Sequence, residues 1–204
     1  MISANQALLR LQEGNLRFRS GGTSANEIDT ANRNRLVVPQ TPFAIILGCS
    51  DSRVPAEIIF GQGLGELFVI RVAGNIVAPS QIGSIEFAAE KFGTRLVVVL
   101  GHSMCGAVEA TLEQLVRPTE SRSPNLHSFV DRIRPAVQPR IDSYTPENSS
   151  ELLQLAVRRN IEASVANLLH GSAILEDLVE NDGLMVVGAE YCLESQVVEF
   201  LVDA

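Results

Sequence analysis

Short runs of mainly apolar residues recur along the chain and are separated by longer stretches with a different pattern. These runs cover residues 43–48, 67–72, 96–100 and 184–187. Continuous apolar runs of this length are typical of strands that are buried on both faces of a parallel sheet. The pattern therefore predicts four buried strands.

Between and around these runs, apolar residues recur every three or four positions, which predicts helices. The predicted helices cover residues 2–19, 80–93, 106–116, 125–134, 147–169 and 194–202. Ser80 is a candidate N-cap and Gly93 a candidate C-cap of the second of these helices. Residues 21–41 are polar and lack a clear period, so they predict a loop or a short arm.

Strands that alternate with helices predict an α/β fold. We expect a single domain over residues 1–204, with a central, mostly parallel sheet of about four to five strands flanked by helices. Residues 1–35 are expected to form an N-terminal helical arm. The helix at 2–19 is short for a helix that is stable in isolation, so the arm is expected to need a partner.

Composition and charge exclude several classes of protein. The 204 residues carry 16 Lys and Arg against 24 Asp and Glu, a net charge of −8. This acidic balance argues against nucleic-acid binding, which needs clustered basic residues. No apolar run approaches the roughly 20 residues of a membrane span, and the N-terminus shows no signal-peptide pattern. We therefore expect a cytoplasmic protein, either free or within a larger compartment.

Residues with candidate metal-binding or catalytic side chains directly follow two of the predicted strands. Cys49 and Asp51 follow the first apolar run, and His102 and Cys105 follow the third. Ligands in open α/β sheets bind beyond the carboxyl ends of the strands. Thiolates together with imidazole select zinc, although each residue taken alone is more often an ordinary core or loop residue. Cys192, the third cysteine, is expected to be a core thiol.

Two segments carry a resemblance to a known family. Residues 49–55, CSDSRVP, and residues 101–108, GHSMCGAV, closely resemble the two signatures of the β-class carbonic anhydrases. Residues 63–75 and 83–88 are also similar to that family. The resemblance runs over nearly the whole chain.

The resemblance implies zinc-dependent, reversible hydration of CO2 to bicarbonate and a proton by zinc-bound hydroxide. By similarity, Cys49, His102 and Cys105 bind zinc. Asp51 either occupies the fourth position or pairs with Arg53, which leaves that position to water. Asp51 and Arg53 are therefore the implied catalytic pair, and Asp51 is also an implied metal ligand.

The resemblance also implies a small apolar substrate pocket. Phe68 and Ala73 match positions that line this pocket, while Gln40 and the backbone N–H of Gly106 match hydrogen-bond donors to the substrate. A regulatory bicarbonate site in part of the family uses a Trp where this chain has Ile46. Because the chain contains no Trp, we expect that regulation to be absent.

The expected partners are CO2 or bicarbonate and further copies of the chain, in a homodimer or a dimer of dimers. Two alternatives remain open at this point. The scaffold could hydrolyse carbonyl sulfide or carbon disulfide, which are linear isosteres of CO2. The chain could also be a catalytically silent structural homologue.

Overall fold

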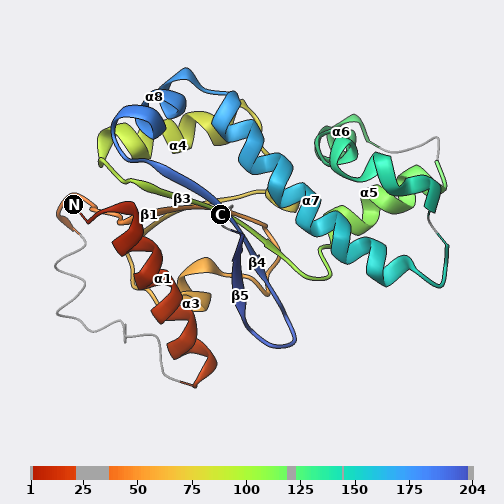
Figure 1. The fold of residues 1–204 in the computed structure, drawn as a ribbon, viewed down its shortest axis with the longest axis horizontal. Helices are drawn as coiled ribbons and strands as arrows, with labels where there is room; N and C mark the ends of the chain where they lie inside the picture. The colour runs from red at the N-terminus through yellow and green to blue at the C-terminus, as the bar shows by residue number, and fades with distance from the viewer. Residues whose placement is uncertain (1, 22–36, 119–122, 144, 202–204) are drawn as a thin grey trace.

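A five-stranded sheet forms the centre of the computed structural model, with strand order β2-β1-β3-β4-β5 (Figure 1). The structure describes residues 2–21, 37–118, 123–143 and 145–201. Neighbouring strands are parallel except for β4 and β5, which are antiparallel. The strands are β1 Ala44–Gly48, β2 Leu67–Arg71, β3 Leu96–His102, β4 Met185–Tyr191 and β5 Val198–Leu201. The predicted parallel α/β architecture is confirmed.

The two central strands explain why the sheet was visible in the sequence. All residues of β1 and all residues of β3 are buried. Both faces of these strands are covered, so both faces must be apolar, which gives a continuous run instead of an alternating pattern. β3 extends to His102, so the polar residue at its end is held by the same ladder of hydrogen bonds as its apolar residues.

Helices cover both faces of the sheet (Figure 1). One apolar cluster joins β1 and β3 to the face that carries α4, α5, α6, α7 and α8, and the other joins them to α1 and α3. The helices are α1 Ala4–Arg19, α3 Ala56–Ile59, α4 Pro79–Lys91, α5 Gly106–Val116, α6 Pro124–Val137, α7 Ser149–His170 and α8 Ala173–Asn181, with 3₁₀ turns η2 Ala73–Asn75 and η3 Gln138–Ser143. No helix in the described part of the chain is both long enough and apolar enough to span a membrane.

The predicted helices over 106–116 and 147–169 are confirmed within two residues, whereas α3 and α8 were not predicted. The predicted N-cap Ser80 is wrong. Helix α4 begins at Pro79 and its N-cap is Ala78, because proline favours the first helical position, where its missing N–H costs nothing. Gly93 follows the C-cap Phe92 and has a φ of 63°, the left-handed conformation expected after a helix.

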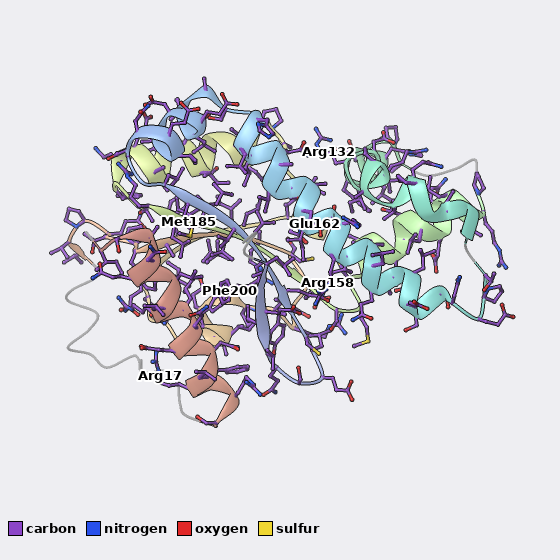
Figure 2. The ribbon with its side chains drawn as sticks, viewed as in Figure 1. Arg17, Arg132, Arg158, Glu162, Met185 and Phe200 are labelled. Atoms are coloured by element: carbon purple, nitrogen blue, oxygen red, sulfur yellow. The ribbon has the colours of Figure 1, made fainter. Side chains whose placement is uncertain are left out.

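The predicted helix over 194–202 is wrong, because the chain turns back and forms the antiparallel edge strand β5. Gln196 closes the turn with a φ of 60°. Arg158, which lies on α7 (Figure 2), then pairs with Glu190 of β4 at 2.8 Å and also with Glu199 of β5. Pairing with β4 and this ion pair therefore override the helical periodicity of the segment.

Helix α1 packs on its own chain through a face of small residues. Ala4, Ala7 and Gly14 are buried in this contact. Asn15 donates to the carbonyls of Ile59 and Gln196 and accepts from the N–H of Val198, so it ties the helix to the β4–β5 turn.

Of the arm predicted over residues 1–35, the structure describes helix α1 and the few residues beside it. Residues 22–35 of the arm lie outside the described part of the chain. Leu9 and Leu16 of α1 remain exposed.

Candidate metal centre

Three candidate ligand residues meet at the carboxyl ends of β1 and β3, which are neighbours in the sheet. Cys49 directly follows β1, His102 is the last residue of β3, and Cys105 is the N-cap of α5. All three are buried, and one ligand atom from each lies within 4.8 Å of the other two. Two Zn–S bonds of about 2.3 Å at a tetrahedral angle place their sulfurs about 3.8 Å apart, so the cluster has the right size for zinc.

The two thiols form a strongly coupled pair. Cys105 donates a hydrogen bond to Cys49, which outweighs the opposing effect of burial and lowers the pKa of Cys49 to about 4. The same bond, together with burial, raises the pKa of Cys105 well above its usual range. The pair thus holds one negative charge in a buried site, which is the electrostatic requirement for binding a cation.

The imidazole of His102 is oriented for ligation through Nε2. Its Nδ1 lies 2.9 Å from the carbonyl oxygen of Ser103, which fixes Nδ1 as the protonated nitrogen when the ring is neutral. Nε2 is buried and has no hydrogen-bond partner among the described residues. Burial lowers the pKa of His102, but Cys49, the Ser103 carbonyl and the Asp51 carboxylate together outweigh burial and raise that pKa. A buried nitrogen without a partner beside a thiolate fits a metal ligand.

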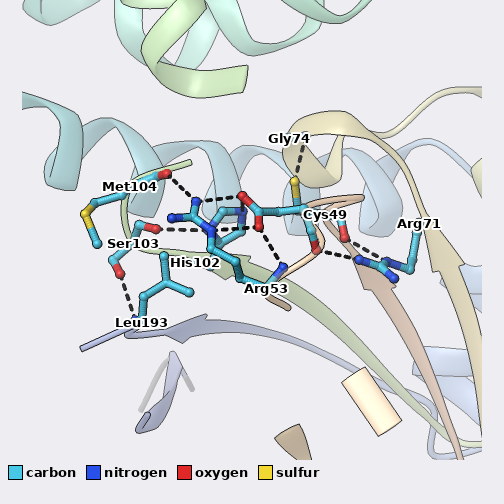
Figure 3. Close-up of polar contacts among 9 residues, drawn as sticks. Cys49, Arg53, Arg71, Gly74, His102, Ser103, Met104 and Leu193 are labelled. Atoms are coloured by element: carbon cyan, nitrogen blue, oxygen red, sulfur yellow. Dashed lines mark hydrogen bonds and ion pairs between the residues drawn. The ribbon is translucent and has the colours of Figure 1, made fainter. Parts of the chain in front are cut away.

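Ser103 anchors the loop that carries His102. Its N–H donates to the carbonyl of Tyr191 at 2.9 Å. Its Oγ accepts from the N–H of Leu193, also at 2.9 Å (Figure 3). The loop is therefore fastened to the end of β4.

Asp51 lies beside the cluster and is held by Arg53 (Figure 3). The guanidinium donates to both carboxylate oxygens, at 2.9 and 2.7 Å, and the backbone N–H of Arg53 adds a third bond. These bonds hold the pKa of the Asp51 carboxyl far below its usual range. Asp51 Oδ2 is nevertheless only 3.9 Å from His102 Nε2. The carboxylate is thus paired with Arg53 and remains close to the three ligand atoms.

Arg71 is a site residue that the sequence reasoning missed. It ends β2, and its side chain donates to the carbonyl of Cys49 at 3.0 Å and to the carbonyl of Asp51 at 2.5 Å (Figure 3). A charged residue at the end of an otherwise apolar strand run was the available signal. The carbonyl groups that Arg71 contacts could be identified only from the β1–β2 register, which pairs Arg71 with Gly48.

The four predicted substrate-binding residues differ in how directly they are connected to this centre. Ala73 begins η2, the turn that contacts Cys49 through Gly74, and Gly106 begins α5 directly after Cys105. Phe68 of β2 is partly buried, and its ring centroid lies 6.0 Å from that of Phe92. Gln40 is exposed in the segment before β1, and no hydrogen bond within the described chain joins it to the centre.

The prediction that Cys192 is a core thiol is wrong. Cys192 is only partly buried and lies in the turn between β4 and β5, where its sulfur accepts a hydrogen bond from the N–H of Ser195. Hydrogen bonds from Ser195 lower the pKa of this thiol. The physical reason is that β4 ends at Tyr191, so Cys192 already lies beyond the sheet.

Comparison with known proteins gives consistent relatives. The model of a family described as carbonic anhydrase matches residues 44–198. A protein named carbonic anhydrase 2 from Mycobacterium tuberculosis is 36% identical over 187 residues, covering 90% of this chain and 86% of the relative. A carbonic anhydrase from Mycolicibacterium smegmatis is 38% identical over 158 residues, covering 72% and 75%.

Solved structures agree with the sequence relatives. One of two tetrameric β-carbonic anhydrases from Sordaria macrospora superposes with a TM-score of 0.73 at 25% identity, covering 84% of this chain and 86% of the other. The β-carbonic anhydrase CafA from Aspergillus fumigatus superposes with a TM-score of 0.74 at 26% identity, covering 84% and 81%.

Proposed function

Because this chain belongs to the β-carbonic anhydrase family, we propose that it catalyses the reversible hydration of CO2 to bicarbonate and a proton. In this proposal Cys49, His102 and Cys105 hold a zinc ion. The single observation that carries the zinc site is the buried group of three ligand atoms within 4.8 Å of one another. His102 Nε2, which has no hydrogen-bond partner among the residues that the structure describes, and the low pKa of Cys49 support the same assignment.

Zinc bound by this set would supply the Lewis acidity that generates hydroxide from water near neutral pH. The chain's own residues have separate tasks. Asp51, kept ionised by Arg53, is placed to accept a hydrogen bond from the attacking hydroxide and to orient it toward the carbon of CO2. Arg53 would keep the carboxylate from becoming a fourth protein ligand of the zinc, which would close the site to water. The released proton leaves to solvent buffer.

Arg71 and Ser103 prepare the two ligand loops for this reaction. Arg71 donates to the carbonyls of Cys49 and Asp51, so it holds the turn between a metal ligand and the orienting carboxylate. Ser103 holds His102 in the tautomer that presents Nε2. Both loops are therefore fixed before substrate arrives, which lowers the cost of reaching the reactive geometry.

CO2 is small and apolar, so its pocket needs apolar walls and few donors. We assign the walls to Phe68 and Ala73 and the donors to Gln40 and the backbone N–H of Gly106. A Cβ atom on Gly106 would meet no atom of the described residues within 4 Å, apart from its chain neighbours and its own helix backbone. The space over the start of α5 is therefore open, and this supports a substrate position there.

The function is tested on the purified full-length chain by metal analysis and by stopped-flow CO2 hydration. We expect about one zinc per chain and turnover that is lost on chelation and restored by zinc. A preparation that holds zinc yet hydrates CO2 no faster than buffer would contradict the assignment.

Substituting Arg53 by alanine is expected to lower kcat for CO2 hydration by at least about tenfold while zinc remains bound, because Asp51 is then free to take the open coordination position. The measurement is kcat with metal content on the same sample. Arg134→Ala is the matched control, since it removes an Asp–Arg pair of 3.0 Å from the exposed face of α6. Full turnover in the Arg53 variant would show that Asp51 does not need this partner.

A further inference from the structure

The turn η2 aims a backbone N–H at one of the two metal thiols. The N–H of Gly74 donates to Cys49 Sγ at 3.4 Å in a buried position (Figure 3). Gly74 has a φ of 70° and Asn75 a φ of 44°, so two consecutive residues are left-handed. This conformation is costly for a residue other than glycine, and it persists only where surrounding contacts enforce it.

Two buried polar residues of α7 supply such contacts. Asn160 Nδ2 donates to the carbonyl of Gly74 at 2.7 Å, and Ser164 Oγ donates to the carbonyl of Asn75 at 3.1 Å. Asn160 is 2% exposed and Ser164 is 3% exposed. They lie one helical turn apart on a face of α7 that is otherwise buried and mostly apolar. Each side chain bonds a carbonyl of the turn, so the helix holds the turn at two successive peptide groups.

Packing against neighbouring side chains further restricts the conformation of the turn. A Cβ atom on Gly74 would lie 2.7 Å from Cδ1 of Ile133 and 3.2 Å from Cβ of Ala107. The turn is thus pressed against α5 and α6 on one side and bonded to α7 on the other. The direction of the Gly74 N–H therefore depends on these helices as well as on the local chain.

We propose that Asn160 and Ser164 are positioning residues that hold the Gly74–Asn75 turn so that the Gly74 N–H remains bonded to the Cys49 thiolate. The proposal rests on the zinc site of the proposed function. A hydrogen bond to a thiolate withdraws electron density from the sulfur and makes it a weaker donor to a metal. Two thiolates and one imidazole form an electron-rich ligand set, so this bond restores part of the Lewis acidity that CO2 hydration requires.

The proposal is tested on the full-length chain loaded with Co²⁺, whose thiolate-to-metal charge-transfer band reports the electron density on sulfur. Asn160→Leu removes the donor to Gly74 and keeps a side chain of similar size, whereas Ser164→Ala removes one oxygen atom. We expect the band to move to longer wavelength in both variants, and kcat/KM of the zinc-loaded Asn160 variant to fall about tenfold. Thr94→Val is the control, since it removes a buried hydroxyl-to-carbonyl bond at the opposite ends of the strands.

The outcomes separate this proposal from the function on which it rests. A band unchanged in the folded variants, in a chain that binds metal and hydrates CO2, overturns the role of α7 alone. If the Asn160 variant does not fold, the Ser164 variant decides the matter. A shift in the Thr94 control of the same size also contradicts the proposal, because it would reflect general loosening. A wild-type chain that binds neither cobalt nor zinc overturns the metal site itself.

Discussion

Replacing Cys105 by serine is expected to remove zinc and to lower CO2 hydration by at least about a thousandfold. A serine hydroxyl does not ionise near neutral pH, so the site would lose one of its two thiolates and its affinity for a soft metal. Without the metal, the chain has no means of generating hydroxide, and the rate falls toward that of the uncatalysed reaction. The measurement pairs metal content with stopped-flow hydration on the same sample.

The chain offers an unusually close control for this experiment. Cys192→Ser is the same substitution at a partly exposed thiol in the β4–β5 turn, outside the group of three ligands. This variant should keep its zinc and its turnover. CO2 hydration above the uncatalysed rate in a Cys105 variant that contains no zinc would contradict the proposed zinc-dependent mechanism. Loss of zinc in the Cys192 variant would instead assign the third cysteine a role that its position does not predict.

Gly14→Ala is expected to destabilise the fold by about 2 kcal/mol. A Cβ atom at this position would lie 1.8 Å from the carbonyl oxygen of Phe60, which is backbone and cannot turn aside. Helix propensity favours alanine over glycine by roughly 0.5–1 kcal/mol, whereas overpacking of this kind costs about 3 kcal/mol. The steric effect is therefore larger, and α1 must move away from α3. Thermal unfolding followed by circular dichroism would show a midpoint lower by about 4–8 °C.

Gly83→Ala separates the two effects. Gly83 lies inside α4, and a Cβ atom there would meet nothing within 4 Å. Only the propensity gain applies, so this variant should be more stable by about 0.5–1 kcal/mol. Equal midpoints for the two alanine variants would show that α1 does not pack against Phe60 as described.

The predictable part of this molecule is the part in which local pattern and burial agree. Val97, Val98 and Val99 are apolar because both faces of β3 are covered, and the run is therefore visible without any knowledge of the fold. Cys49, His102 and Cys105 were found because chemically distinctive residues interrupt the chain where two such runs end. The structure confirms that the three come together.

The features that could not be predicted from the sequence depend on contacts between segments that are distant in the chain. Residues 194–202 have a periodicity that suits a helix, and only the partner strand β4 makes their last part a strand. In the sequence, Asn160 and Ser164 resemble ordinary polar positions on a helix. Their role becomes apparent only from their hydrogen bonds to the carbonyls of η2. The task of Arg71 likewise depends on the register of β2 against β1. Sequence periodicity reports the environment of a residue within its own element, and these roles are set by other elements.

The pairing of His102 with Tyr191 has a consequence for the order in which the site is assembled during synthesis. A growing chain contains all three proposed ligand residues once position 105 has been made, but the strand beside His102 is completed only at position 191. Until position 193 has been made, Ser103 lacks at least one of its two bonds, to the Tyr191 carbonyl and from the Leu193 amide. On the ribosome, the ligand set is therefore complete in sequence long before it is complete in structure.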